Sequence, residues 1–189
     1  MATLAPVGPD DPRTLESSRV LLNEMLGANL YPPAKAADIA QDEEALLLAA
    51  SEGDEVLGAA VCRLLYLEDA DYYHAFGATA LELFTHHKVG SLEVLAVRPT
   101  RQRRGIGSQL TRAQMGWLAD AGCDVAVAVS WIPGGHSASA PMYQRLGFTG
   151  TLEVSDFYLE ESVADGWTCP QCKGPCHCAG ALYYNRLAP

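Results

Sequence analysis

The sequence predicts a mixed α/β (α+β) fold, with a central sheet flanked by helices, and three features carry this prediction. Apolar runs with the length and composition of strands alternate with segments whose apolar residues recur at helical spacing. A strand pattern at 91–97 leads through a basic, glycine-containing turn into a helix that Gly122 ends. The nearly continuous apolar run at 123–131 is typical of a strand buried on both faces and parallel to its neighbour. We expect residues 1–189 to form a single domain.

Composition and charge narrow the classes of protein that fit. The chain is 49% hydrophobic and 19% charged, which is enough apolar material for one well-packed core. No segment has the ~18 consecutive apolar residues of a membrane span, and residues 1–13 lack the pattern of a secretory signal. We therefore expect a cytoplasmic protein without a membrane partner. A net charge of −10 repels nucleic acid, so a nucleic-acid partner is disfavoured.

The first third of the chain predicts a strand, two helices and a hairpin. Glycine, proline and acidic residues separate these segments, and Cys62 lies in an apolar run as a small buried hydrophobe. In order, we expect a strand at 2–7, a helix from Leu15 capped by Thr14 and ended by Gly27, a short helix at 34–44, and hairpin strands at 45–51 and 55–67.

Residues 68–88 have two interpretations. The segment holds acids, tyrosines and three histidines around an apolar stretch at 75–84. It is either a partly helical insertion that overhangs a binding site, where its acids and tyrosines would suit a cationic amine, or a polar surface loop. The spacing of its histidines matches no metal-ligand motif.

Glu93 is a candidate general base. In an ideal strand it shares a face with Leu95 and Val97, among apolar residues. Desolvation raises the pKa of a carboxylate in such surroundings and makes it a usable base near neutral pH. The alternative is a glutamate near the strand end that simply reaches water.

The turn after residue 97 predicts an anion site. Arg98, Arg101, Arg103 and Arg104 place four of the 13 basic residues within seven positions of an acidic chain. Gly105 and Gly107 then begin a helix, whose first amides have no partner inside the helix and attract negative charge. This pattern suits a compact polyanion such as a coenzyme pyrophosphate, whereas a solvated basic loop is the alternative.

The helix that follows and the remaining elements complete the expected sheet. A stripe of Leu110, Ala113, Trp117 and Ala121 should pack on the sheet. Past the strand at 123–131, Ser137 or Ser139 can cap a short helix that carries Tyr143 and stops at Gly147. The last expected strands lie at 151–160 and 181–187.

A cysteine-rich loop at 167–180 separates these last two strands. Its four cysteines favour a structural zinc ion, because four thiolates close a tetrahedral site and leave no position for water. Disulfides are disfavoured in a chain without a secretion signal, and the spacing does not fit the common iron–sulfur motifs. His177 is an alternative ligand within the narrow C-x-C pair. The proposed ligands are Cys169, Cys172, Cys176 and Cys178.

Two motifs resemble those of one enzyme family. The segment 102–107, QRRGIG, looks like the Q/R-x-x-G-x-G/A pyrophosphate signature of the GNAT family of N-acetyltransferases. The segment 142–148, MYQRLGF, is similar to the x-Y-x-x-L-G-F ending of that family. His136 stands where family members often carry asparagine, seven residues before the tyrosine, so this loop departs from the family pattern. The resemblance covers nearly the whole chain and implies a mixed central sheet of about seven strands.

The resemblance also implies an activity and roles for particular residues. It implies an acyltransferase that moves an acetyl group from acetyl-CoA to a primary amine on a small molecule or peptide, by direct attack in a ternary complex. Tyr143 would protonate the departing thiolate, unless it is an ordinary buried tyrosine, and Glu93 would take the proton of the amine. Coenzyme contacts would come from Leu95, Ala96 and Val97 along the strand, and from Gln102, Arg103, Arg104, Gly105, Ile106, Gly107 and Ser108 at the turn.

Other functions stay open at this point. The same fold suits a non-catalytic acyl-CoA-binding or interaction module, or a transferase that takes an aminoacyl group from a charged tRNA, which the acidic charge disfavours. The acceptor, the acyl chain length and the oligomeric state, a homodimer included, are not determined by the sequence.

Overall fold

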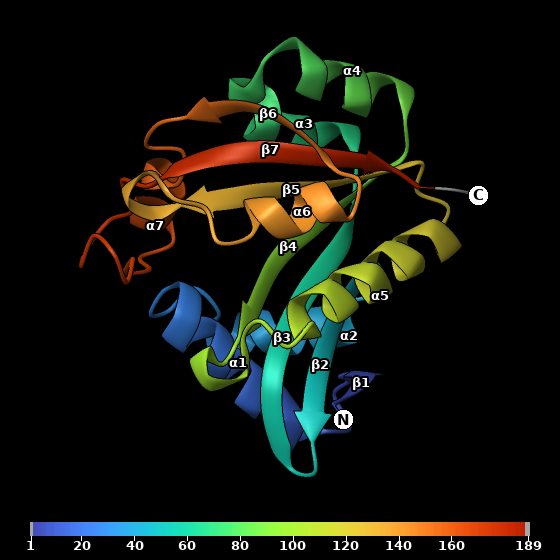
Figure 1. The fold of residues 1–189 in the computed structure, drawn as a ribbon, viewed down its shortest axis with the longest axis vertical. Coiled ribbons are helices and arrows are strands. Elements are labelled where there is room, and N and C mark those ends of the chain that lie inside the picture. The colour runs from blue at the N-terminus through green and yellow to red at the C-terminus, as the bar shows by residue number, and fades with distance from the viewer. Residues whose placement is uncertain (1, 188–189) are drawn as a thin grey trace.

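The apolar runs of the sequence form strands of one mixed sheet at the centre of the computed structural model (Figure 1). The structure describes residues 2–187. Within these residues the sheet has seven strands, which confirms the expected mixed α/β architecture. The strands are β1 (Thr3–Pro6), β2 (Ala45–Glu52), β3 (Glu55–Leu65), β4 (Val89–Val97), β5 (Val125–Ile132), β6 (Thr149–Val154) and β7 (Ala179–Arg186).

Helices flank the sheet and connect its strands. The first helix begins earlier than expected, because Asp11 and not Thr14 caps it: the Asp11 carboxylate accepts a hydrogen bond from the Thr14 amide at 3.1 Å. The α-helices among residues 2–187 are α1 (Pro12–Leu26), α2 (Pro33–Gln41), α3 (Ala70–Tyr73), α4 (Ala78–His86), α5 (Ile106–Asp120), α6 (Ala140–Arg145) and α7 (Leu159–Ala164).

The sheet divides between β4 and β5. Its strand order is β1-β2-β3-β4-β5-β7-β6, and β4 with β5 is the parallel pair while the other neighbours are antiparallel. This pair is short. Only Val89–Ser91 are paired with Val125–Val127, and the two strands then diverge (Figure 1). The sheet thus has an amino-terminal half, β1–β4, and a carboxy-terminal half, β5–β7, with an opening between them.

Both faces of the sheet are covered. On one face α5 and α6 bury Leu110, Leu118 and Tyr143. On the other face α1 and α2 cover the amino-terminal half, and the segment from α3 to α4 covers the carboxy-terminal half (Figure 1). The β5 segment 125–128 is fully buried, as expected for a strand covered on both sides.

The buried face of α5 differs from the expected stripe. Ala121 is exposed, whereas the buried residues are Ile106, Leu110, Thr111, Gln114 and Leu118. A local irregularity explains the buried glutamine. The β3–β4 ladder shifts register after Val61, and the Gln114 amide donates to the Val61 carbonyl at 2.8 Å. The hydrogen bond offsets the desolvation of both groups.

Residues 68–88 form part of the core, so their interpretation as a polar surface loop was wrong. The segment folds into α3 and α4 with short 3₁₀ turns before each. Tyr73, Phe76 and Leu83 are buried against Val127 and Leu182 of the carboxy-terminal half. The sequence concealed this because polar residues separate the apolar ones at irregular intervals.

The expected strand at 151–160 was too long. β6 runs from Thr149 to Val154, a turn follows, and Leu159–Ala164 forms α7. Asp156 at this turn has φ of +52°, a conformation that ends a strand. The hairpin, the short helix at 33–41 and the last strand agree with the sequence within a few residues. No helix of residues 2–187 is long and apolar enough to span a bilayer.

Candidate functional site

The turn between β4 and α5 presents the amino terminus of α5 to solvent. Gly105, the residue before the helix, has φ of +85°, which lies in the left-handed region that glycine adopts without strain. Ile106 is buried in the core beside Gly58, so it contributes only its backbone to this surface. The first amides of α5 therefore face outward at a turn held in one shape.

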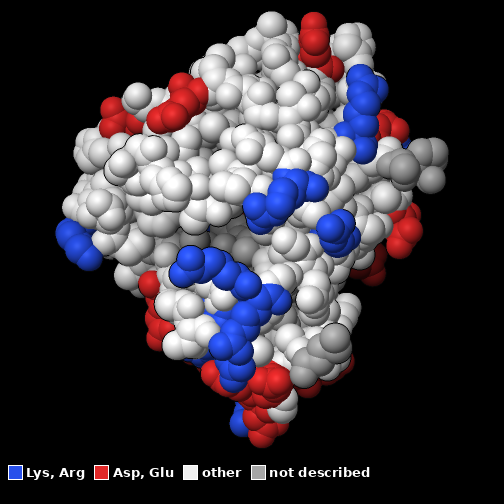
Figure 2. All heavy atoms as spheres, in the orientation of Figure 1, with Lys and Arg blue, Asp and Glu red and all other residues white. Residues whose placement is uncertain are grey.

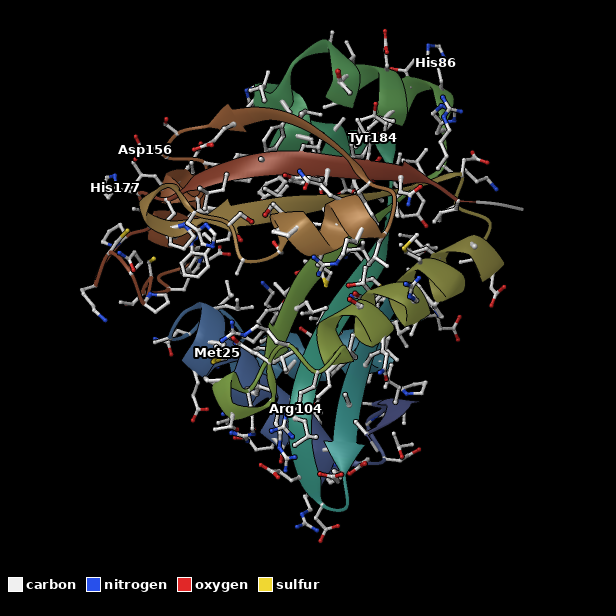
Figure 3. The ribbon with its side chains drawn as sticks, viewed as in Figure 1. Met25, His86, Arg104, Asp156, His177 and Tyr184 are labelled. Atoms are coloured by element: carbon white, nitrogen blue, oxygen red, sulfur yellow. The ribbon has the colours of Figure 1, made fainter. Side chains whose placement is uncertain are left out.

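The four arginines of this turn divide into two pairs. Arg98 donates to the Val56 carbonyl at 2.7 Å, and Arg101 pairs with Glu52 and Glu55 at 3.3 and 3.5 Å. Arg103 and Arg104 are exposed and form no ion pair within residues 2–187. Figure 2 shows Lys and Arg side chains gathered beside the hollow between the two halves, and Figure 3 labels Arg104. The positive charge available to an anion therefore comes from Arg103 and Arg104, whereas Arg98 and Arg101 hold the turn in place.

The other residues expected here lie between the turn and β4. Gln102 donates to the Val97 carbonyl at 3.0 Å, so its side chain joins the turn to the end of β4. A Cβ on Gly107 would be 3.4 Å from the Met142 sulfur and 3.6 Å from Leu95, so the first turn of α5 packs closely between α6 and β4. Ser108 is half-buried in the same turn. Leu95, Ala96 and Val97 lie on the part of β4 that has diverged from β5.

Glu93 does not share a face with Leu95 and Val97, so that expectation was wrong. In the β3–β4 ladder Leu92 and Val94 are paired with consecutive residues of β3, which leaves Glu93 as the extra residue of a β-bulge. Leu95 and Val97 pack against α5. Glu93 lies on the opposite face, where the Tyr31 hydroxyl donates to its Oε1 at 2.9 Å. Burial, with the Glu93 charge, raises the pKa of Tyr31 well above its ordinary value, so Tyr31 remains a donor.

Tyr143 lies on α6 at the other side of the opening. Its ring packs against Phe148 and Tyr183, with centroids 5.2 and 5.4 Å away, and the residue is 6% exposed. Within residues 2–187 no group forms a hydrogen bond with the Tyr143 hydroxyl, and this oxygen is not one of the fully enclosed polar atoms that lack a partner, so it has contact with solvent. Burial raises its pKa far above the ordinary value, so the hydroxyl stays protonated.

The structure adds Glu161 on α7, a carboxylate that the sequence analysis did not single out, since it lies just past the expected strand at 151–160. Glu161 is half-buried and accepts a hydrogen bond from the Tyr72 hydroxyl at 3.1 Å. Burial raises its pKa, and the negative charges of Asp165 and Glu93 act in the same direction, while the Tyr72 hydrogen bond and Lys35 oppose the shift.

These residues form two hydrogen-bonded pairs whose charges act on each other: the charge of Glu93 helps to raise the pKa of Glu161, and that of Glu161 helps to raise the pKa of Tyr31. Glu93 and Tyr31 belong to the amino-terminal half, whereas Glu161 and Tyr72 belong to segments packed on the carboxy-terminal half. We call these four residues the carboxylate–tyrosine group. Tyr158 donates to the Val129 carbonyl at 3.4 Å, and its pKa is raised first by burial and then by the charge of Glu161 and by Tyr143.

The four cysteines converge on one point. Their sulfur atoms all lie within 4.8 Å of one another, with Cys178 Sγ 3.9 Å from Cys169 Sγ and 3.7 Å from Cys172 Sγ. The backbone amides of Cys172 and His177 point at sulfur atoms from 3.4 Å, an arrangement that stabilises thiolates. Cys176 is fully buried. This donor set fits one tetrahedral thiophilic ion.

His177 is not a member of that group, so its suggested role as a ligand was wrong. Its imidazole faces away and pairs with Asp156 through Nδ1 at 2.8 Å, at the edge of the molecule (Figure 3). The backbone of the C-x-C pair directs Cys176 and Cys178 inward and the histidine between them outward. His136 is also exposed, after the 3₁₀ turn Pro133–Gly135.

Comparisons with known proteins agree with this geometry. Over its full length the fold is similar to that of Arabidopsis thaliana NAA60 in complex with acetyl-CoA (TM-score 0.71, 13% identity, 99% of each chain). It is also similar to the ribosomal-protein-S18-alanine N-acetyltransferase of Escherichia coli (0.64, 15%, 100% of this chain and 96% of that one) and to an agmatine N-acetyltransferase (0.66, 14%, 99% and 100%).

Sequence comparison gives the family directly. No curated protein matches the chain in sequence. The model of the acetyltransferase (GNAT) family, however, matches residues 18–148, which include the diverging parallel strands, the glycine turn and the helix of Tyr143. The chain therefore belongs to the acetyltransferase (GNAT) family.

Proposed function

We propose that this protein transfers an acetyl group from acetyl-CoA to a primary amine. The observation that carries the proposal is the opening between β4 and β5, which begins after three paired residues and lies beside the amino terminus of α5. An extended thioester arm that lies along residues 95–97 would have backbone groups to pair with, and its diphosphate would reach the amides of α5.

The turn fits a diphosphate in shape and charge. Gly105 has open space around its Cα, since a Cβ there would meet only the end of the Gln109 side chain at 3.7 Å. Arg103 and Arg104 add two uncommitted cationic groups beside the outward amides. Backbone donors and arginine side chains are the groups that bind phosphate most strongly in proteins. We therefore assign the diphosphate to residues 102–108.

The acyl transfer needs an amine without its proton and a donor for the leaving sulfur. Glu93, held by Tyr31, would accept the amine proton directly or through a water. The C–N bond forms as the C–S bond breaks, and Tyr143 would donate its hydroxyl proton to the sulfur and regain one from solvent. The free, protonated hydroxyl of Tyr143 supports this role, because no partner in the fold competes for its proton.

The carboxylate–tyrosine group favours an amine that arrives as a cation. Glu93 and Glu161 are two carboxylates whose charges act on each other, and tyrosine hydroxyls hold both in place. Carboxylates beside aromatic rings attract ammonium groups through charge and cation–π interactions. One protein of similar fold is named as an agmatine N-acetyltransferase and another as an N-acetyltransferase of an alanine in ribosomal protein S18, so both a small amine and a peptide fit this proposal.

We also propose that zinc occupies the cysteine site. The four thiols lie close enough together to bind one ion. Zinc prefers four soft sulfur donors in a tetrahedral arrangement, which this cluster can provide. The ion supplies a fixed link among the four side chains and no open position for chemistry. Cys172→Ser should lower metal content from one equivalent per chain and reduce the melting temperature. A variant with full stability and no metal would contradict a structural ion.

A thiol-release assay with acetyl-CoA and a panel of amines tests the activity. The panel should contain a monoamine, a diamine, a peptide amino terminus and a lysine peptide. Acetyl-CoA affinity is measured in parallel by calorimetry. Turnover of any amine supports the proposal. Binding without turnover would indicate an acyl-CoA-binding module instead, and the absence of binding would remove the coenzyme site.

A further inference from the structure

The cysteine loop connects the two halves of the molecule. Ala28 lies on the loop between α1 and α2. It exchanges two backbone hydrogen bonds of 2.9 and 3.0 Å with Thr168 of the cysteine loop, as an antiparallel bridge. Gly27 lies under the Trp167 ring so closely that a Cβ there would be 2.9 Å from a ring carbon. We call residues 167–178 the cysteine clasp. It follows α7 and precedes β7, and it contacts the segment that leads from α1 to Tyr31.

The clasp also holds α7. The Cys176 amide donates to the Ser162 hydroxyl at 2.8 Å, and Ser162 directly follows Glu161. Ser162 is 2% exposed, so this hydrogen bond is fully sheltered. The same buried cysteines pack against Trp131 at the end of β5 and against Tyr158. Contacts from three segments around the opening thus converge on the cysteines.

Apart from its contacts with Gly27, Ala28 and Ser162, the clasp has little structure of its own. None of its residues belongs to a helix or a strand. Within the knuckle only two backbone hydrogen bonds are formed, from the Cys169 amide to the Gly174 carbonyl and from the Lys173 amide to the Cys169 carbonyl. A chain with so few internal bonds relies on cross-links, and one ion bound by four thiolates supplies them. The shape of the clasp therefore depends on metal loading.

The coenzyme side is independent of the clasp. Among residues 2–187, no hydrogen bond or ion pair joins the clasp to the turn at 98–108 or to α5. The turn is held by its own contacts to Val56, Glu55 and Val97 in the amino-terminal half. Loss of the metal should leave this part of the site unchanged.

We propose that the metal-bound cysteine clasp sets the acceptor side of the site, by fixing Tyr31 and its partner Glu93 relative to Glu161. Metal loading then controls the affinity for the amine and leaves coenzyme affinity unchanged. This inference rests on the proposed acetyl transfer, which names the two ligands. The clasp has a route for exchange of its metal, since Cys172 is exposed beside a surface hollow of about 290 Å³ that His177 and Gln171 also line.

Hydrogen exchange of the full chain tests the clasp without any substrate. The metal-loaded protein is compared with the same protein after treatment with a zinc chelator. We expect the amides of Ala28, Thr168 and Cys176 to exchange at least ~10-fold faster without metal, because opening of the clasp exposes them together. The amides of residues 109–115 in α5 serve as the internal reference and should not change. Equal protection of Ala28 in both samples would overturn the proposal, whatever the activity.

A variant that breaks the bridge and keeps every cysteine separates the clasp from the metal. Thr168→Pro removes the amide that donates to Ala28. We expect one equivalent of metal, acetyl-CoA affinity within about twofold of the original, and a KM for the preferred amine raised by roughly 10-fold with a smaller change in kcat. Gln171→Ala, on an exposed residue of the same loop, is the control and should match the original protein.

The outcomes distinguish this inference from the proposed function. If no amine is turned over but metal removal frees Ala28, the clasp stands and the proposed activity fails. If amines are turned over and neither chelation nor Thr168→Pro changes KM, the activity stands and the control of the acceptor side fails. A parallel loss of acetyl-CoA affinity would show general unfolding and would also contradict the inference.

Discussion

Replacement of Tyr143 by phenylalanine separates its chemical role from its structural one. The residue is 6% exposed, and no group within residues 2–187 forms a hydrogen bond with its hydroxyl. Phenylalanine retains the ring contacts with Phe148 and Tyr183 at 5.2 and 5.4 Å. Because the substitution breaks no hydrogen bond within the protein, the free energy of unfolding should stay within about 1 kcal/mol of the original value. The melting temperature should shift by no more than about 4 °C, since a domain of this size shifts by ~2–4 °C per kcal/mol.

The effect on the reaction should be large. General acid catalysis contributes about 10²–10⁴-fold, so kcat of Tyr143→Phe should fall by at least ~10²-fold while acetyl-CoA affinity changes by less than about twofold. Thiol release measures kcat, and calorimetry measures affinity. Because burial raises the pKa of Tyr143 far above its ordinary value, the acid stays protonated through neutral pH, and its loss should lower the rate equally from about pH 6 to pH 9.

A neighbouring tyrosine provides the control. Tyr183 is 8% exposed and its ring packs against that of Tyr143, so Tyr183→Phe removes a similar hydroxyl from the same cluster. It should keep kcat within about twofold, since the residue is given no role in proton transfer. Unchanged kcat in Tyr143→Phe, or an equal fall in both variants, would refute the assignment of the acid.

Three further predictions concern the turn and the two carboxylates. Gly105→Val forces a β-branched residue to φ of +85°, which costs about 1–2 kcal/mol of backbone strain. Relief of this strain moves the first amides of α5, so acetyl-CoA binding should weaken by at least ~10-fold. Unchanged affinity in calorimetry would show that the diphosphate does not bind at this turn. Glu93→Gln should lower kcat/KM at neutral pH by ~10²-fold, and Tyr31→Phe by less because the base itself remains; an unchanged kcat/KM in Glu93→Gln would assign the base elsewhere. The folded-state pKa of Glu161 is raised, so the folded protein binds more protons than the unfolded chain, and its contribution to stability falls as pH rises from the unfolded value through the folded one. Urea denaturation should therefore show Glu161→Gln gaining stability relative to the original protein across that interval, and a constant difference between the two would contradict a buried carboxyl.

The zinc prediction and the clasp prediction have different readouts. Metal content and melting temperature of Cys172→Ser report on the ion, whereas protection of the Ala28 amide reports on the bridge to Thr168. If the metal-free protein still protects the Ala28 amide, the clasp closes without an ion. That result would contradict the inference that metal loading sets the acceptor side.

Local sequence rules determined the parts of this protein that depend on neighbours in the chain. The hairpin at 45–65, the parallel strands around α5 and the turn at Gly105 follow from short-range patterns, since strand alternation, helix caps and left-handed glycines are set within a few residues. The convergence of four cysteines is of the same kind, because they lie within ten consecutive residues.

Only the tertiary structure decided what lies opposite each side chain. One extra residue in β4 moved Glu93 to the other face of the sheet. This bulge is determined by the pairing of β4 with β3, which no local pattern specifies. The partners Tyr31, Tyr72 and Glu161 come from segments far apart in sequence, and the bridge between Ala28 and Thr168 joins residues separated by most of the chain. Such contacts depend on how the halves of the sheet pack together, because burial and register are properties of the whole fold and not of any segment.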